Sequence, residues 1–240
     1  MFFTKGDILC VHIYIGCCIL GVNKINRRKQ RSENADKEKN YSWVGFPEIG
    51  ISFEVRVSDK EEVYHSLIPE EIVKELALSK AENVADDLRE KQEQVKQISF
   101  DKKNNVLLDT IVIGADTIVV SDGSILGKPK DEADAVRMIR SLQGRSHKVY
   151  TGVAILDYDD EGKRKSVVHA VETEVFVNPM SDEEIREYAA TGEPLDKAGA
   201  YGIQGQFAAY IERIDGDYYN VVGLPVSYVY RQLKEIAEKD

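Results

Sequence analysis

The stretch Ile111-Val112-Ile113-Gly114-Ala115-Asp116-Thr117-Ile118-Val119-Val120 places one carboxylate between two apolar runs. The residues from Val106 to Ile113 predict a strand that is buried on both faces, because the run is largely apolar. We expect this strand to end in Gly114 and the residues that follow it. A buried carboxylate without a partner is costly, so Asp116 needs a metal ion, a cation or hydrogen-bond donors. The stretch therefore predicts a central strand with a polar site at its end.

The segments on either side of this stretch alternate between strand and helix patterns. With no internal repeat, this alternation predicts one mixed α/β domain over residues 1–240. The apolar run 8–22 fits a buried strand, and a signal peptide is the alternative. The section 193–225 is rich in Gly and Tyr, which permits tight turns and close approach of the backbone to a ligand. Predicted strands are 8–22, 53–57, 147–158 and 166–177, and predicted helices are 69–96, 131–144, 181–191 and 226–238.

The predicted helix 69–96 carries a lysine on its apolar stripe. Pro69 and two following glutamates suit the first turn of a helix. Lys80 lies seven residues after Val73 and four after Leu76, so it falls on the stripe instead of opposite it. The spacing leaves two interpretations open, since the ammonium group could reach water along a snorkelling stem or could face a ligand.

The composition excludes several classes of protein and site. The formal net charge is −10, and an acidic surface repels the phosphate backbone of nucleic acids. The four histidines are scattered and the three cysteines crowd into 10–18, so neither set has zinc-ligand spacing and a metal would be held by oxygen atoms. The odd number of cysteines fits a reducing compartment. The apolar run 8–22 is too short to cross a bilayer.

The residues that could carry chemistry are carboxylates and lysines. The segment Gly123–Pro129 is not a phosphate-binding P-loop, because three residues instead of four separate its glycines and Pro129 replaces the required Ser or Thr. Oxygen-ligated Mg²⁺ with lysines would suit phosphate ester or anhydride chemistry, while a structural domain with surface ion pairs is the alternative. The candidate residues are Glu61, Glu62, Lys80, Asp116, Lys128, Asp196 and Lys197.

Six motifs stand out between about Phe53 and the C-terminus. They are Gly114–Thr117, Leu126–Pro129, Leu142–His147, Thr151–Val153, Glu193–Gly205 and Asp217–Pro225. Together, and in this order, they resemble the motifs of the Maf family of nucleotide pyrophosphatases. The residues around Asp116 and those of the fifth motif are similar to the family branch that hydrolyses dTTP and UTP, in contrast to the branch that acts on 7-methyl-GTP.

This resemblance implies both a fold and a reaction. The fold would be an elongated, twisted mixed sheet flanked by helices around a central nucleotide cleft. The reaction would be hydrolysis of a nucleoside triphosphate to the monophosphate and pyrophosphate, with Mg²⁺ or Mn²⁺ as cofactor. The resemblance also implies a cytoplasmic homodimer whose partner is the nucleotide, without a nucleic acid polymer or a membrane.

The resemblance assigns a role to individual residues of this chain. Asp116 would orient or deprotonate the attacking water and help to hold the metal. Glu61 would be a second metal ligand, although the adjacent Glu62 is an open alternative. Lys80 and Lys128 would bind phosphate oxygens, which favours the ligand-facing interpretation of the lysine on the stripe. A further substrate-binding residue, at the nucleotide site, would be Gln204.

The N-terminal segment 1–50 departs from the family pattern. The family opens with a Ser-x-Ser-Pro-Arg-Arg loop that binds phosphate, and the nearest stretch here is Val22–Arg28. It keeps Arg27 and Arg28, which are predicted to bind substrate, but it lacks the serines and the proline. Two hypotheses follow: an active pyrophosphatase, or a catalytically weakened nucleotide-binding or regulatory protein on the same fold.

Overall fold

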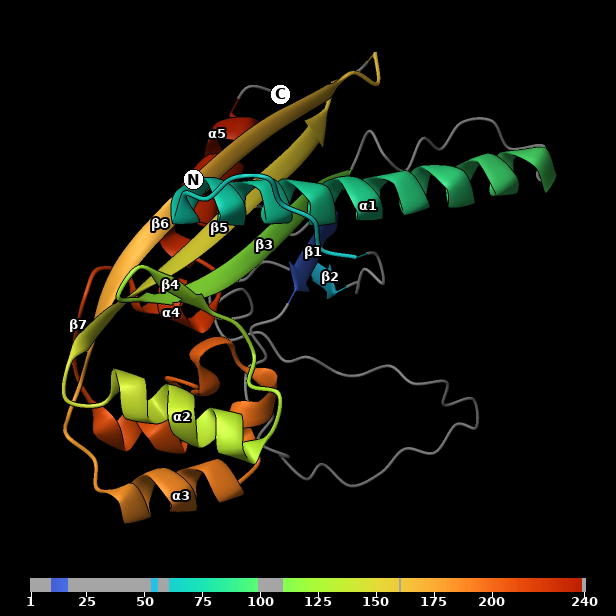
Figure 1. Cartoon of the computed structure of the whole chain (residues 1–240). Helices are drawn as coiled ribbons and strands as arrows, with labels where there is room; N and C mark the ends of the chain where they lie inside the picture. Colours follow the sequence, from blue (N-terminus) through green and yellow to red (C-terminus); the bar gives the residue numbers. More distant parts are fainter. Residues whose placement is uncertain (1–9, 17–52, 56–60, 99–109, 160, 239–240) are drawn as a thin grey trace, which may run out of the picture.

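The computed structural model describes residues 10–16, 53–55, 61–98, 110–159 and 161–238 (Figure 1). The predicted substrate-binding residues Arg27 and Arg28 lie outside the described residues, as does most of the segment 1–50. Within the predicted strand 8–22, the structure describes strand β1, Cys10–Gly16.

The described strands form one mixed sheet. Strands β2, β1, β3, β5, β6 and β7 are neighbours in that order, and β4 pairs with β3. Strands β2, β1 and β3 run parallel, whereas β3, β5, β6 and β7 are antiparallel to their neighbours. This arrangement confirms the predicted mixed α/β class. After β1, the strands are β2 Phe53–Val55, β3 Thr110–Ser121, β4 Ser124–Leu126, β5 Ser146–Tyr158, β6 Arg164–Val177 and β7 Ile211–Asp215.

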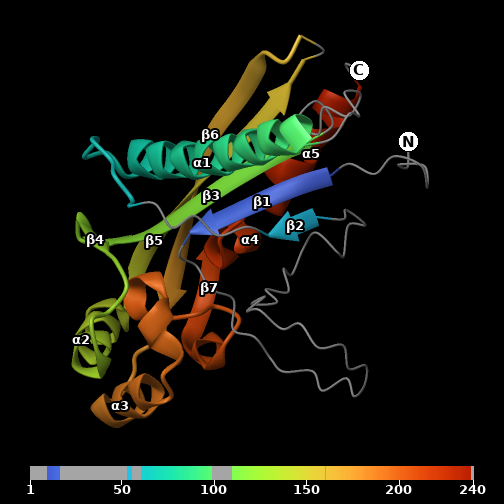
Figure 2. The same cartoon turned by 90° about the vertical axis from the view of Figure 1, so that its right-hand side faces the viewer.

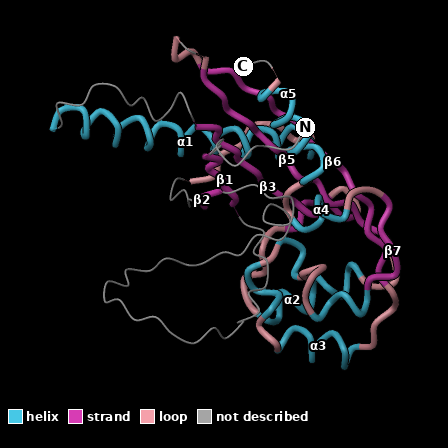
Figure 3. The backbone as a smooth tube through the Cα atoms, turned by 180° about the vertical axis from the view of Figure 1, so that it is seen from behind, coloured by secondary structure: helices cyan, strands magenta, loops and turns pink. Residues whose placement is uncertain are grey.

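Helices cover both faces of this sheet. Helix α1 packs against residues such as Val112 and Leu156, while α5 packs against their neighbours Ile113 and Ile155, which project from the opposite face. Helices α2 and α3 build a second core at the end of the sheet far from α1 (Figures 2 and 3). No described helix has an apolar stretch that could span a lipid bilayer. The helices are α1 Pro69–Ile98, α2 Glu132–Leu142, α3 Asp182–Ala190, α4 Tyr218–Val222 and α5 Val226–Ala237, with 3-10 helices η1 Glu193–Asp196, η2 Ala198–Ala200 and η3 Gln206–Tyr210.

Strand β3 runs through the polar motif instead of ending at it. The predicted end at Ile113 is wrong, because β3 continues from Thr110 to Ser121 and pairs with β5 along this length. Glycine suggested a turn, but Gly114 lies in the middle of the strand directly below α1. Asp116 is therefore held by a regular strand, with neighbours on both sides, and does not lie in a loop.

Two glycines allow the backbone of α1 to lie directly on the sheet. A Cβ atom on Gly114 would collide with the carbonyl oxygen of Ala77, and one on Gly152 would collide with that of Val73. Gly152 is the register partner of Asp116 on β5. Because a backbone cannot move aside as a side chain can, this contact fixes the height of α1 above Asp116.

The predicted helices and the remaining predicted strands are present. The side chain of Asp131 caps α2 by accepting from the Asp134 amide at 2.8 Å, and Ser181 and Glu184 form the predicted capping box of α3. The apolar stripe of α1 is buried as expected. The section 193–225 contains elements that were not predicted, namely η1, η2, η3, β7 and α4, because elements of three to five residues are too short to show a period.

We expect Gly152→Ala to lower the free energy of unfolding by about 3 kcal/mol or more, because the added methyl group must displace the backbone of α1. Gly127→Ala is the matched control, since nothing lies within 4 Å of a Cβ atom at that position. Denaturant unfolding of the two variants and the unmodified chain measures the difference. Equal stability of both variants would contradict the proposed backbone contact.

Candidate active site

A buried ion pair joins α1 to β3. Asp116 is 3% exposed and Lys80 is 5% exposed, and the Lys80 ammonium group donates a hydrogen bond to Asp116 Oδ1. Lys80 lies on the apolar stripe of α1, and Asp116 projects from β3 on the same side as Gly114, towards α1. The snorkelling interpretation of Lys80 is therefore wrong, because its ammonium group points into the protein.

A second carboxylate contacts the same lysine. Lys80 Nζ lies 2.8 Å from Glu62 Oε1, and the Glu62 side chain is about half exposed. The segment that carries Glu62 is attached to α1, because the amide of His65 donates to Glu75 Oε2 at 2.6 Å. Both adjacent glutamates are exposed, and of the two the structure places Glu62 on the lysine.

The electrostatics of this cluster follow from burial and from three charges. Burial raises the pKa of Asp116 to about 6; Lys80 and, more weakly, Lys128 oppose this shift, and Glu62 adds to it. Burial alone would lower the pKa of Lys80, but the carboxylates of Asp116 and Glu62 outweigh burial and raise it. Lys80 therefore stays protonated at neutral pH, and Asp116 can change its protonation state near physiological pH.

Lys128 approaches the cluster from the loop that follows β4. Its exposed ammonium group lowers the pKa of Asp116 through its charge. The preceding residue, Gly127, accepts a hydrogen bond from the amide of Gly199 at 3.1 Å. The structure therefore brings four of the candidate residues, Glu62, Lys80, Asp116 and Lys128, into one electrostatic group.

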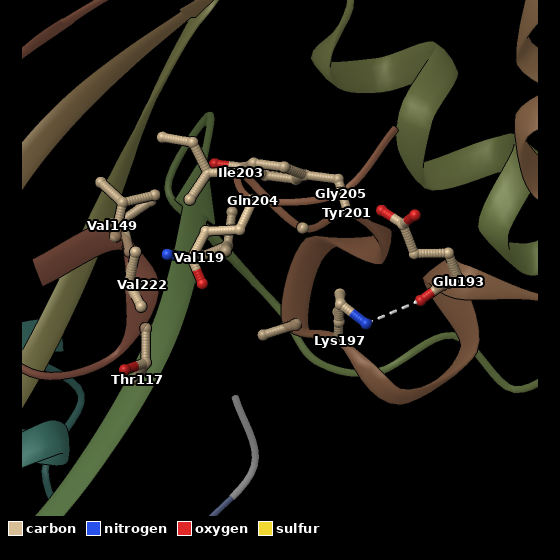
Figure 4. Close-up of a pocket in the computed structure, with 13 residues that line it drawn as sticks. Thr117, Val119, Val149, Glu193, Lys197, Tyr201, Ile203, Gln204, Gly205 and Val222 are labelled. Carbon is tan, nitrogen blue, oxygen red and sulfur yellow. Dashed lines mark hydrogen bonds between the residues drawn. The ribbon is translucent and has the colours of Figure 1, made fainter. Parts of the chain in front are cut away.

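A pocket of about 520 Å³, open to solvent, lies beside the residue that follows Asp116 (Figure 4). Thr117 and Val119 contribute one wall from β3, and Gln204 and Lys197 contribute polar groups from the opposite wall. Gln204 thus lies in a pocket, as expected for a residue at a nucleotide site. Thr117 and Asp116 are consecutive in a strand, so the pocket and the ion pair are on opposite faces of β3.

Among the described residues, strand pairing along one edge of β3 is interrupted beside Asp116. Strand β1 pairs with β3 as far as Gly16, which lies opposite Asp116, and β4 begins to pair at Val119. Within the described residues, no strand pairs with this edge of β3 at Thr117 and Ile118. The carboxyl end of a parallel strand at such a break is where open α/β sheets bind ligands.

Four polar residues in or next to the pocket have no role assigned by the resemblance, although two of them, Asp196 and Lys197, are among the candidates named from the sequence. Lys197 is buried, and its ammonium group lies 2.7 Å from Asp196 Oδ1 and donates to the backbone oxygen of Glu193 at 3.0 Å. Glu193 and Tyr201 also line the pocket. All four residues belong to the motif Glu193–Gly205, so the motif located them, but no periodic pattern showed which of its side chains turn inward.

A buried histidine lies behind the pocket. His147, 3% exposed, has its Nε2 atom 2.7 Å from the hydroxyl group of Tyr201, and the two rings meet edge-on with centroids 5.3 Å apart. Its Nδ1 atom is buried without a hydrogen-bond partner among the described residues. Burial lowers the pKa of His147 to about 4, so the ring is neutral at physiological pH.

The donor set at the ion pair fits a divalent cation. Carboxylate oxygens suit Mg²⁺ and Mn²⁺, and Mg²⁺ commonly uses one or two protein carboxylates together with substrate phosphates and waters. Asp116 and Glu62 supply two carboxylates through their shared contact with Lys80. No group of three or more His, Cys, Asp and Glu side chains suited to a metal occurs in the part of the chain that the structure describes. The site therefore fits a divalent cation whose coordination is completed by substrate phosphates and water.

Comparison with known proteins gives consistent matches. A family model described as Maf-like protein matches residues 46–236. A protein of Dictyoglomus turgidum named dTTP/UTP pyrophosphatase is 45% identical over 181 residues, which cover 75% of this chain and 82% of the relative. Proteins with the same name from Alkaliphilus metalliredigens and Bacillus cytotoxicus are each 46% identical, over 74% and 77% of this chain and 82% and 85% of the relatives.

We expect the contribution of His147 to stability to fall between pH 6.5 and pH 4. The unfolded chain binds a proton on this residue below its ordinary pKa of 6.5, whereas the folded chain does so only near pH 4. Unfolding therefore takes up a proton on His147 in this window, and the His147 contribution to the free energy of unfolding decreases by up to about 3 kcal/mol as the pH falls. Asp116, whose pKa burial raises to about 6, contributes in the opposite direction between about pH 6 and pH 4, so the His147 component is the difference between the unmodified chain and a variant without this histidine. Denaturant unfolding at several pH values measures the slope. His147→Gln should remove this component, and an unchanged slope would contradict the assignment.

Proposed function

This chain belongs to the family of Maf-like proteins, and we propose that it is a pyrophosphatase for nucleoside triphosphates of the dTTP and UTP type. It hydrolyses the bond between the α and β phosphorus atoms and releases the monophosphate and pyrophosphate. The observation that carries the proposal is the Lys80–Asp116 ion pair with Glu62, which lies beside a pocket and next to an edge of β3 that is unpaired among the described residues. The names of relatives that are 42–46% identical support the choice of substrate.

Asp116 is the catalytic base in this proposal. It orients the attacking water and accepts its proton. Burial raises its pKa to about 6, close to the working pH that suits a general base, and a bound divalent cation would lower this pKa and keep the carboxylate ionised. The regular strand β3 holds the carboxylate in position, so little reorganisation is needed when substrate binds.

Lys80 and Lys128 bind phosphate oxygens. Lys80 keeps its charge although it is buried, because two carboxylates raise its pKa. A cation in a buried site stabilises negative charge on a leaving pyrophosphate more strongly than one in water does. Lys128 is exposed and sits on the loop after β4, so it can follow the outer phosphates of the substrate.

A divalent cation, Mg²⁺ or Mn²⁺, is the proposed cofactor. Asp116 and one of the two adjacent glutamates would hold it, and the contact with Lys80 favours Glu62 over Glu61. When bound, the cation would neutralise phosphate charge and help to orient water. Lys80 would then act as the fixed neighbour whose positive charge opposes protonation of Asp116.

Other parts of the proposal rest on the family resemblance. Gln204 would bind the nucleotide within the pocket, and Arg27 and Arg28, outside the described residues, would bind phosphate. We also propose that residues 1–240 form a single domain, and that the protein is a cytoplasmic homodimer.

We expect Asp116→Asn to lower kcat with UTP by about 100-fold or more, the lower end of the contribution of general acid–base catalysis. Release of pyrophosphate from UTP and dTTP, with CTP and 7-methyl-GTP for comparison, measures the activity, and a thermal melt checks the fold. If the unmodified chain binds UTP but does not hydrolyse it, the protein is the weakened nucleotide-binding form instead of an enzyme. Near-normal turnover of the folded variant would reject Asp116 as the base.

We expect Glu62→Gln to raise the Mg²⁺ concentration for half-maximal activity by about 10-fold or more, because the variant loses a charged oxygen ligand. Glu61→Gln is the matched control, with the same chemical change one residue away, and it should shift this concentration little. A magnesium titration of pyrophosphate release at saturating UTP compares the two. The opposite order of effects would assign the ligand role to Glu61.

A further inference from the structure

One carboxylate in the pocket wall holds both ends of a short loop. Glu193 Oε2 accepts a hydrogen bond from the amide of Gln206 at 3.0 Å, and Glu193 Oε1 accepts one from the hydroxyl group of Tyr188 at 2.9 Å. The Tyr188 hydroxyl in turn accepts from the amide of Gly202 at 3.3 Å. The loop 202–206, which carries Gln204, is therefore attached to Glu193 directly at its end and, through the Tyr188 hydroxyl group, at its start.

The backbone of the loop 202–206 is in close contact with the side chains of Glu193 and Lys197. A Cβ atom on Gly205 would collide with both carboxylate oxygens of Glu193, and one on Gly202 would lie 2.7 Å from Lys197 Cε. Gly205 has a φ of −97°, which any residue can adopt, so it is glycine because of space and not because of backbone conformation. The close approach restricts the loop to one position relative to Glu193.

Glu193 is itself held through its backbone. Its amide donates to the hydroxyl group of Thr191 at 3.2 Å, and its carbonyl oxygen accepts from Lys197 Nζ at 3.0 Å. It begins η1, directly after α3. The side chain is thus anchored at its base as well as at its carboxylate, and Figure 4 shows it directed towards Gly205.

We propose that Glu193 and Tyr188 are positioning residues for the nucleotide: they fix the loop 202–206, and through Gln204 they set the affinity of the pocket for substrate. This inference rests on the proposed function. It adds Glu193 and Tyr188 as residues that affect substrate binding through Gln204. Neither residue takes part in the chemical step at the phosphates.

The contacts of the two residues distinguish positioning from direct binding. Both carboxylate oxygens of Glu193 already accept hydrogen bonds from the protein, and its negative charge would repel a phosphate. Tyr188 is 4% exposed and packs on Phe207, with ring centroids 5.1 Å apart. Burial and the charge of Glu193 raise the pKa of Tyr188, so its hydroxyl group stays protonated and continues to donate.

The expected consequence concerns binding more than turnover. If the loop is released at one end, only a fraction of the molecules holds Gln204 in the binding position, and the apparent affinity decreases by that fraction. The ion pair at Asp116 belongs to α1 and β3 and is not part of this hydrogen-bonded group. Loss of the Tyr188 hydroxyl should therefore raise KM and leave kcat almost unchanged.

The decisive variant is Tyr188→Phe in the full chain, with Tyr210→Phe as its matched control. Tyr210 packs on the same Phe207 ring, but within the described residues its hydroxyl group makes no hydrogen bond to the loop. With UTP and Mg²⁺, we expect Tyr188→Phe to raise KM by about 10-fold, the effect of losing a hydrogen bond to a charged group, and to change kcat by less than about twofold. Tyr210→Phe should leave both constants unchanged.

A binding measurement gives a readout that does not depend on hydrolysis. Calorimetric titration with α,β-methylene-UTP should show the same rise in Kd for Tyr188→Phe, and a larger rise for Glu193→Gln, whose single amide oxygen has to serve two donors. A lower kcat at unchanged KM, an unchanged Kd, or an equal effect of Tyr210→Phe would overturn the inference.

The same experiments separate the inference from the proposed function. If the unmodified chain binds the analogue but releases no pyrophosphate, the proposed function fails, and the calorimetric comparison of the variants still decides about the loop. If the unmodified chain hydrolyses UTP and the variants bind as tightly as it does, the positioning role alone is rejected. Absence of binding to the unmodified chain would overturn both.

Discussion

The structure depends on one buried charge and its cation. Asp116 lies in the middle of a central strand, where an isolated carboxylate would be costly, and Lys80 makes its burial tolerable. The pairing requires α1 to lie at a defined height over β3, and the glycines below the helix provide that height. The position of the helix and the glycines in the strands below it therefore both serve one requirement, which is that the buried carboxylate of Asp116 has the ammonium group of Lys80 beside it.

The sequence was sufficient to predict the main elements and part of the site. The length and stripe of α1, the caps of α2 and α3, and the place of Lys80 on that stripe all follow from local periodicity and cap residues, whereas the direction of its ammonium group did not. The sequence pattern gave a wrong prediction for the end of β3. Gly114 was interpreted as the end of a strand, because a glycine that allows a helix to approach cannot be told from a turn glycine without the third dimension.

The rest of the site depends on contacts between segments that are distant in the chain. The contact that favours Glu62 over Glu61 in the proposed metal site is with Lys80, and no alternation in an irregular segment could predict that contact. Glu193 and Tyr188 were missed as a pair, because their importance lies in loop amides 13 and 14 residues further on, as the hydrogen bonds to Gln206 and Gly202 show. Side chains that act on backbone groups leave no pattern in the sequence.

The hydrogen bond between Gly199 and Gly127 has a consequence for engineering this protein. It connects the segment that forms one wall of the pocket to the residue before Lys128, across about seventy positions of the chain. Under the proposed function, the groups that select the base and a lysine that binds phosphate are therefore coupled through the backbone. A programme of directed evolution that reshapes the pocket for another base should then select for specificity and rate together instead of in succession.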